Sequence, residues 1–475
     1  MLTFADYRKH DALSLADLVR TKQVTPLELL DAALARAAEV NPKINAIVLD
    51  HEDVARKVLK DGLPQGPLTG VPYLLKDLGA ALKGTITTGS LSYAREAVAV
   101  ADSTYVERIK NAGLVVFGKT HSPELGLSPS SESRMFGATR NPWNLNHIAG
   151  GSSGGAAAAV AAGIVPVAHA TDGGGSIRIP ASCCGLFGLK PTRARTPQGP
   201  KRGEGWGGAS VGHVVSRSVR DSAAFLDATA GAAPGDPYVA PHAARAFLDE
   251  VKMAPGRLRI AFSTKPAIPT EVHPDAIAAV RDAAKLCESL GHIVEEAAPD
   301  INGMEIMAAQ GIVISANVAF AVDEAAEALG RTARAEDVER ATWFRVENAR
   351  KTDSSAYAQA MNTLHLLGRT VAAFMTTYDV ILQPTAAQPP LPIGVLNMDR
   401  EDLAQMFREM IAFIPYTGIY NLTGQPSANI PLHWNAAGLP IGTMFTTCFG
   451  DEATLFRLAA QLEQARPWKD RYAPL

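Results

Sequence analysis

Three glycine-rich stretches of the chain contain a lysine and serines that together could perform nucleophilic catalysis. A serine hydroxyl becomes a good nucleophile when a base takes its proton and hydrogen-bond donors stabilise the oxyanion that follows its attack. Lys76 is the predicted base, Ser176 is the predicted nucleophile, and glycine N–H groups are the predicted oxyanion donors. The three stretches span residues 70–77, 150–155 and 171–180.

Lys76 must be neutral to act as a base. It ends an apolar run and precedes Leu78, and burial among such neighbours lowers the pKa of a lysine by disfavouring its charged form. The alternative is a surface or ion-paired lysine. We assign that structural role to Lys119 and Lys190, which also follow apolar runs.

The order and spacing of these stretches resemble the amidase signature family. The two serines Ser152 and Ser176 are 176 − 152 = 24 positions apart, as in that family, and Gly-Leu-Phe-Gly-Leu-Lys-Pro-Thr follows at residues 185–192. The resemblance runs from about residue 12 to the end of the chain. It implies an α/β fold with a central mixed β-sheet surrounded by α-helices. It also implies that Ser152, in a cis peptide, relays the proton from Ser176 to Lys76.

The same resemblance implies roles for residues around the predicted nucleophile. Ser153 is expected to orient Lys76 or Ser152 by a hydrogen bond. Independently of the resemblance, Asp172 and Arg178 flank the predicted nucleophile and are expected to pair, either as support for it or as a purely structural ion pair. The backbone N–H groups that would hold the oxyanion belong to Gly173, Gly174, Gly175 and Ser176.

Substrate contacts are predicted at Gly126, Leu127 and Ser128, which fall where the family contacts its substrate through a loop. The family often has a larger residue at the position of Gly173, so this chain departs from the pattern beside its oxyanion donors. Trp206 lies between glycines and is either a pocket residue or an ordinary loop aromatic.

The composition predicts a globular protein with a large core. The predicted serine–lysine mechanism needs no cofactor and no metal. The 475 residues are 47% hydrophobic and 20% charged, and the net charge of −3 gives no reason to expect nucleic acid or an anionic membrane as a partner. Four cysteines and an N-terminus without an apolar segment favour a cytoplasmic protein. The histidines show no metal-ligand spacing. A homodimer is left open.

The chain is predicted to be one amidase domain. Residues 1–65 form an N-terminal helical collar, residues 66–230 the catalytic core, and residues 231–475 the rest of the sheet and the cover of the substrate channel. A capping box at Thr25 predicts a helix after it. Further segments have helical or strand patterns. Helices are expected at 53–59, 103–112, 274–290, 303–369 and 451–465, and strands at 114–117, 164–167, 258–262, 380–382, 421–426 and 438–442.

The predicted reaction is hydrolysis of a C–N bond in a small-molecule amide through an acyl-enzyme. The main alternative is the glutamine-hydrolysing subunit of a tRNA amidotransferase, which uses the same lysine and serines. A non-catalytic binding protein of the same fold is a further alternative. A phosphate cradle at 150–155 lacks the Gly-Lys-Ser/Thr ending of a P-loop. A Ser-His-Asp triad using His121, His147, His169 or His213 lacks the Gly-x-Ser-x-Gly turn.

Overall fold

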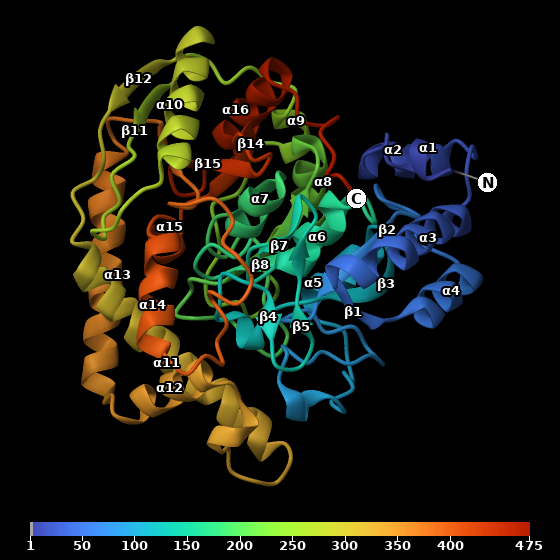
Figure 1. Ribbon diagram of the computed structural model, residues 1–475. Coiled ribbons are helices and arrows are strands. Elements are labelled where there is room, and N and C mark those ends of the chain that lie inside the picture. Colours follow the sequence, from blue (N-terminus) through green and yellow to red (C-terminus); the bar gives the residue numbers. More distant parts are fainter. Residues whose placement is uncertain (1–2) are drawn as a thin grey trace.

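A mixed β-sheet of eleven strands forms the centre of the computed structural model, which describes residues 3–475 (Figure 1). Strands β2, β3 and β8 run parallel, as do β11, β12 and β13, and antiparallel pairs join the two groups. In spatial order the strands are β1 (Ile47–Asp50), β3 (Val115–Thr120), β2 (Pro72–Lys76), β8 (Val167–Asp172), β10 (Val211–Ser216), β9 (Phe187–Lys190), β14 (Ser427–Trp434), β15 (Pro440–Thr447), β13 (Val380–Pro384), β11 (Arg259–Phe262) and β12 (Ile293–Glu296).

Two short ribbons lie outside this sheet. They pair β4 (Glu132–Ser133) with β5 (Gly137–Ala138), and β6 (Arg140–Asn141) with β7 (Asn144–Ile148). Because one mixed sheet is surrounded by helices, the predicted fold class is confirmed.

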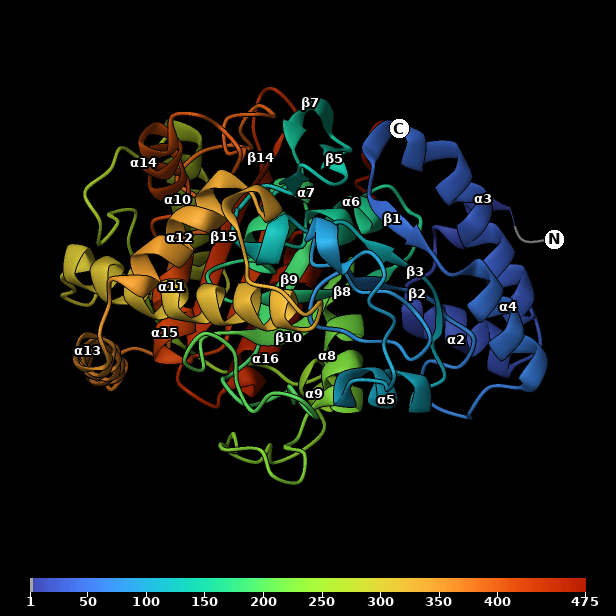
Figure 2. The ribbon, with the colours of Figure 1, turned by 90° about the horizontal axis from the view of Figure 1, so that it is seen from below.

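Helices surround the sheet, and two groups of them lie at its two ends. Helices α1–α4 lie at one end, whereas α11–α14 lie at the other, as both views show (Figures 1 and 2). The helices are α1 (Phe4–Tyr7), α2 (Ala12–Arg20), α3 (Pro26–Ile44), α4 (Glu52–Asp61), α5 (Thr104–Asn111), α6 (Gly154–Ala161), α7 (Arg178–Cys184), α8 (Val219–Thr229), α9 (Phe247–Glu250), α10 (Pro274–Ser289), α11 (Gly303–Glu327), α12 (Arg340–Arg350), α13 (Ser354–Phe374), α14 (Leu403–Phe413), α15 (Thr417–Thr423) and α16 (Glu452–Ala465), with 3₁₀ turns η1 (Ser92–Ala94), η2 (Glu124–Gly126) and η3 (Ala335–Asp337).

The N-terminal segment is less uniform than a helical collar. Its capping box is confirmed, because Thr25 accepts a hydrogen bond from the N–H of Glu28 while the Glu28 side chain accepts one from the N–H of Thr25. However, the segment also contributes β1, which pairs antiparallel with β3 at the edge of the sheet. The segment is therefore joined to the catalytic core by backbone hydrogen bonds. The division of the chain at residue 65 stays a prediction.

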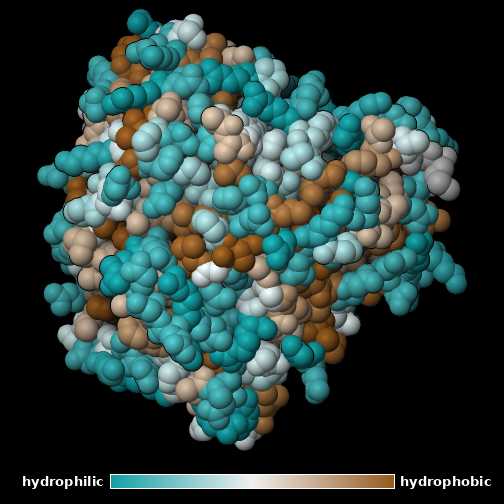
Figure 3. Space-filling view, viewed as in Figure 1, coloured by the Kyte–Doolittle hydropathy of each residue, from teal (hydrophilic) through white to brown (hydrophobic). Residues whose placement is uncertain are grey.

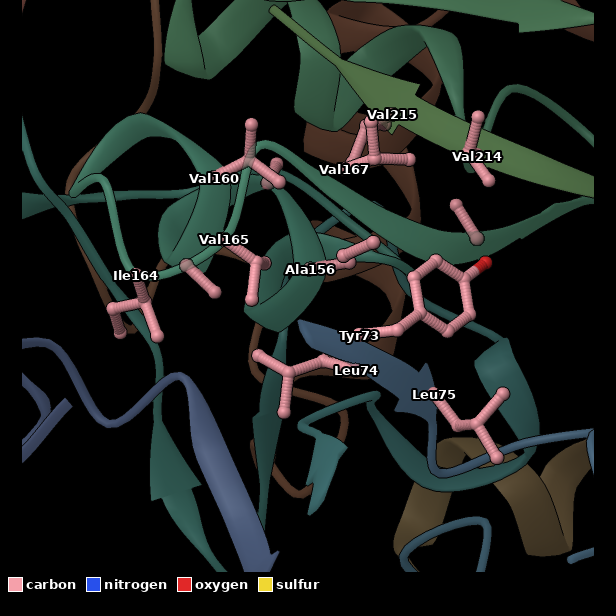
Figure 4. Close-up of a cluster of buried hydrophobic side chains, with 14 of the residues drawn as sticks. Tyr73, Leu74, Leu75, Ala156, Val160, Ile164, Val165, Val167, Val214 and Val215 are labelled. Carbon is pink, nitrogen blue, oxygen red and sulfur yellow. The ribbon is translucent and has the colours of Figure 1, made fainter. Parts of the chain in front are cut away.

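The core beside the site is built from β2 and the small-residue helix α6. All eight residues of α6 are buried, and its alanines and glycines let the helix pack closely on the sheet. Figure 4 shows Tyr73 and Leu74 of β2 near Ala156 and Val160 of α6. Burying a valine or leucine contributes about 1.5–3 kcal/mol each. This packing fixes β2, whose last residue is Lys76.

Two strand predictions were wrong at their boundaries. The strand expected at 164–167 begins only at Val167, because Pro166 cannot donate a ladder hydrogen bond. The segment expected at 421–426 first completes helix α15, which ends at Gly424 with a left-handed φ of 83°. Strand β14 starts after it, at Ser427.

Helix α11 is long and apolar enough to cross a membrane by length and composition, with a mean hydropathy of 1.6 over its most apolar window. Core helices of soluble proteins meet the same criterion, and α11 packs against α12 and α13. The face of the molecule in Figure 3 is largely hydrophilic, with hydrophobic residues gathered towards its middle.

Candidate active site

Lys76, Ser152 and Ser176 are brought to one edge of the sheet by three elements. Lys76 is the last residue of β2, and β8 lies beside β2 and runs parallel to it. Ser152 precedes α6, and Ser176 lies in the turn between β8 and α7. Because parallel strands end at the same edge, the ends of β2 and β8 meet there, where α/β proteins usually bind their ligands.

Lys76 has the environment that a lysine base requires. Its Nζ donates a hydrogen bond to Ser152 Oγ at 2.7 Å and another to Thr171 Oγ1 at 2.8 Å. The residue is fully buried. Burial lowers the pKa of Lys76 to about 7, although the carboxylate of Asp172 acts in the opposite direction. Near neutral pH a large fraction of Lys76 is therefore uncharged and able to accept a proton.

The peptide bond between Gly151 and Ser152 is cis, as the resemblance implied. Ser176 is partly exposed and lines a pocket. Within residues 3–475 its hydroxyl has no hydrogen-bond partner, so no hydrogen bond joins it to Ser152. Catalytic hydrogen bonds commonly form or shorten only when the substrate binds.

The backbone around Ser176 offers fewer oxyanion donors than the sequence suggested. The N–H of Gly175 donates to Asp172 Oδ1 at 2.6 Å, so the prediction that it binds the oxyanion was wrong for this state. No hydrogen bond of the described residues uses the N–H groups of Gly173, Gly174 or Ser176. Of these residues, Gly174 and Ser176 line the pocket.

The presence of glycine at position 173 is explained by Trp206, which lines the pocket. A Cβ on Gly173 would lie 2.8 Å from the Trp206 ring, which is too close for any real contact. The tryptophan ring therefore leaves no room for a side chain at residue 173. The open question about Trp206 is thus decided in favour of a pocket residue.

Asp172 and Arg178 form the predicted ion pair directly behind the nucleophile. Arg178 Nε donates to Asp172 Oδ2 and Nη2 donates to Oδ1, both at 3.0 Å, and both side chains are fully buried. Burial acts to raise the pKa of Asp172, but the charge of Arg178 and hydrogen bonds from Arg178 and Asn421 outweigh it and hold the pKa well below its usual value. The ionised Asp172 then accepts from the N–H groups of Gly175 and Ile177, which fixes the turn.

Sequence reasoning missed Asn421, and it expected Ser153 to hydrogen-bond Lys76 or Ser152, which it does not. Asn421 Nδ2 donates to Asp172 Oδ1 at 2.8 Å from helix α15, far along the chain. Ser153 Oγ contacts neither Lys76 nor Ser152; it donates to the carbonyl of Thr171 and accepts from the Thr171 N–H, both at 3.2 Å. Ser153 thus holds the threonine that contacts Lys76.

The pocket at Ser176 has a volume of about 300 Å³, at the small end of the range for ligand sites. Gly126, Leu127 and Ser128 line it, as predicted, although the Ser128 hydroxyl donates to the carbonyl of Leu396. Most of the remaining wall is apolar and was not predicted. It includes Ile179, Ile268, Met307, Gln310, Gly311, Ile314, Phe344, Arg345, Phe407, Met410, Ile411, Ile414 and Gly418.

Most of these wall residues come from α11, α12, α14 and α15, where hydrophobic spacing alone does not distinguish a pocket from a core. A larger surface groove of about 1520 Å³ lies between α2, α3 and α4. None of Lys76, Ser152 and Ser176 lines that groove.

The histidines that composition allowed as triad members lie elsewhere. His121 contacts Thr139 and Ser133, and His213 contacts Ser222. His169 accepts a hydrogen bond from the Lys76 N–H, and burial lowers its pKa to about 3. None of these rings contacts Ser176 in the described part of the chain.

The comparisons with known proteins agree with this geometry. The model of the amidase family matches residues 28–456. This chain belongs to the amidase family. The amidase is 37% identical to a 6-aminohexanoate-cyclic-dimer hydrolase of Paenarthrobacter ureafaciens over 473 residues, which covers 97% of this chain and 96% of the relative.

Solved structures of amidases show the same fold. A 6-aminohexanoate cyclic dimer hydrolase complexed with substrate matches with a TM-score of 0.92 and 35% identity, over 98% of this chain and 99% of that one. A bacterial aryl acylamidase of the amidase signature family matches with a TM-score of 0.88 and 28% identity, over 97% of this chain and 96% of that one. The chain is therefore an amidase, a hydrolase that acts on amide bonds.

Proposed function

We propose that this amidase hydrolyses a small-molecule amide through an acyl-enzyme on Ser176, with Lys76 as base and Ser152 as proton relay. The observation that carries the proposal is the buried side-chain nitrogen of Lys76. It lies 2.7 Å from Ser152 Oγ, and burial lowers the pKa of Lys76 to about 7. A lysine that is half neutral at physiological pH and bonded to a serine beside a pocket is suited to general base catalysis.

The reaction would proceed in two halves. Ser176 Oγ attacks the amide carbonyl carbon while its proton passes to Ser152, and the Ser152 proton passes to neutral Lys76. The tetrahedral intermediate collapses, the C–N bond breaks, and the relay returns a proton to the leaving nitrogen. Water then attacks the Ser176 ester with the same base, which releases the acid and restores the serine.

The oxyanion of each tetrahedral intermediate would be held by backbone donors. The N–H groups of Gly173, Gly174 and Ser176 have no other use among the described residues, and they lie in the turn that Asp172 holds rigid. Removing one such donor typically costs about 10²–10³ in rate. Preorganised donors of this kind explain why the turn is fixed by a buried ion pair.

The pocket supports a small amide with an apolar segment as the substrate. Its walls are mainly aliphatic and aromatic side chains, with few polar groups. The related hydrolase is named for the 6-aminohexanoate cyclic dimer, an amide of this general kind. Glutamine fits less well, because no aspartate or glutamate among the described lining residues could pair with its ammonium group. The geometry therefore favours the amide hydrolase over the glutamine-hydrolysing subunit.

The test is amine release by the purified chain alone and by its Ser176→Ala variant. The panel contains an anilide, an aliphatic amide, a lactam, a carbamate and glutamine. We expect turnover of at least one amide other than glutamine and its loss in the variant. The melting temperature should stay nearly unchanged, because the Ser176 hydroxyl has no hydrogen bond to lose. Ser289→Ala, at the end of α10, is the control.

Activity retained by Ser176→Ala would move the nucleophile to another residue. Turnover of glutamine alone would instead favour the amidotransferase subunit.

A further inference from the structure

One arginine in the pocket at Ser176 has no hydrogen-bond or ion-pair partner among the residues that the structure describes. Arg345 lies on α12, lines the pocket and is partly buried. Within residues 3–475 its guanidinium makes no hydrogen bond and no ion pair. By contrast, Arg340 and Arg350 on the same helix pair with Glu401 and Asp323, respectively. Of these three arginines on α12, Arg345 therefore lines the pocket and has no carboxylate beside it.

The surroundings of Arg345 hold the side chain in place without neutralising it. The guanidinium carbon lies 5.2 Å from the centre of the Phe407 ring, within the range of a cation–π contact. On its other side the side chain reaches Gly311 of α11, where Nη1 would lie 3.8 Å from an added Cβ. Burial lowers the pKa of Arg345, but a guanidinium remains charged in proteins.

A charge that is removed from water without a partner is costly, and proteins usually pair it or bind a ligand with it. The lining of this pocket supplies no carboxylate among the described residues. The missing anion would therefore arrive with the substrate. Ligand sites of this type are mostly apolar, with a few charged or polar groups that fix the orientation of the ligand.

We propose that Arg345 binds a carboxylate carried by the amide substrate, at the end of the molecule remote from the bond that is cleaved. The inference rests on the proposed function of Ser176, which lines the same pocket. The substrate class is then an amide with one carboxylate and no cationic group, joined by an apolar chain. A carboxylate matches the flat, two-pronged donor face of a single guanidinium. A phosphate dianion would need further donors, and besides Ser176 and the Trp206 indole only Gln310 is a polar side chain of the lining with no hydrogen bond in the described chain.

The test compares substrates that differ only in the remote group. On the acyl side, the 4-nitroanilide of adipic acid is compared with that of hexanoic acid. On the amine side, N-hexanoyl-6-aminohexanoate is compared with N-hexanoyl-hexylamine. Because a hydrogen bond to a charged group is the interaction at stake, we expect kcat/KM to favour the carboxylate in one pair by roughly ten- to a hundredfold. The pair that shows the preference also identifies which side of the substrate occupies the pocket.

Variants assign the preference to Arg345. Arg345→Met should bring the ratio of kcat/KM for the carboxylate substrate to kcat/KM for its uncharged counterpart within about twofold of one. Arg345→Lys should retain part of the wild-type preference for the carboxylate. Arg340→Met removes a cation from the same helix, outside the pocket lining, and should leave the ratio as in the wild type. Equal kcat/KM values within both pairs, or a preference that survives Arg345→Met, would overturn the inference.

A binding measurement separates this inference from the proposed function. Calorimetry with the Ser176→Ala protein compares adipic acid monoamide with hexanamide, with and without Arg345→Met. Tighter binding of the carboxylate that depends on Arg345 supports the inference even if no amide is hydrolysed, in which case the proposed function alone fails. Hydrolysis that depends on Ser176, with no carboxylate preference in binding or rate, leaves the function standing and removes the inference.

Discussion

Replacing Lys76 with methionine should abolish amide hydrolysis and, near neutral pH, make the folded protein more stable. The lysine is fully buried, and burial lowers its pKa from 10.5 to about 7. The unfolded chain keeps the proton up to about pH 10.5, whereas the folded chain releases it above about pH 7. Between these values the unfolded state binds more protons, so folding is penalised and the penalty falls as the pH rises.

The magnitude follows from the two pKa values. Their difference of about 3.5, at about 1.36 kcal/mol for each pKa unit, is a penalty of about 5 kcal/mol well below pH 7, of which about 4 kcal/mol remains at pH 7. At pH 9 about 2 kcal/mol of it remains. Methionine carries no proton and escapes this penalty, but it leaves the hydroxyls of Ser152 and Thr171 without their donor, at a cost of about 2–3 kcal/mol. We therefore expect a net gain of about 2 kcal/mol at pH 7 and little or none at pH 9.

The assay is denaturant unfolding of wild type and Lys76→Met at both pH values, beside amide turnover. Lys119→Met is the matched control. Lys119 is also buried, in the neighbouring strand β3, and burial lowers its pKa to about 8 against the attraction of Asp77. It should show a pH-dependent stability change while turnover remains. A Lys76→Met protein that is destabilised equally at pH 7 and pH 9 would show that Lys76 is a charged, paired lysine, which refutes the reasoning.

Three further predictions concern the same site. The pH profile of kcat/KM should rise about tenfold from pH 6 to pH 8, because the neutral form of Lys76, with its pKa of about 7, must be present; a flat profile would exclude a lysine base. Arg178→Met leaves the charge of Asp172 buried without its partner, so urea unfolding should show a loss of about 3–5 kcal/mol. Gly173→Val should lower both the activity and the melting temperature, because the valine side chain would collide with the Trp206 ring. Adding Trp206→Ala removes the ring and should recover the melting temperature. If the valine has no effect on either quantity, the ring moves freely.

The sequence predicted which residues lie together around Lys76 better than it predicted the pocket wall. Lys76, Ser152 and Ser176 are set in three short motifs that occur in a fixed order, so their types and spacing are informative. The ion pair of Asp172 with Arg178 was also predictable, because opposite charges six positions apart flank one turn.

The remaining features depend on distances that a sequence does not contain. Asn421 joins the Asp172 carboxylate from a helix almost 250 positions later, and no local pattern announces that contact. Gly175 looked like an oxyanion donor until its N–H was found on Asp172. The pocket wall from α11, α12 and α14 has ordinary amphipathic spacing, so Arg345 looked like any surface arginine of a helix.

The origin of the pocket wall has a consequence for how this enzyme could change. The lysine and the two serines all occur before residue 180, whereas most of the wall comes from residues 268–418. Mutations in the later part of the chain can therefore alter which amides are accepted without touching Lys76, Ser152 or Ser176. A library confined to α11, α12 and α14 would explore new selectivities with these three residues unchanged, and its inactive members would report on folding or on substrate binding.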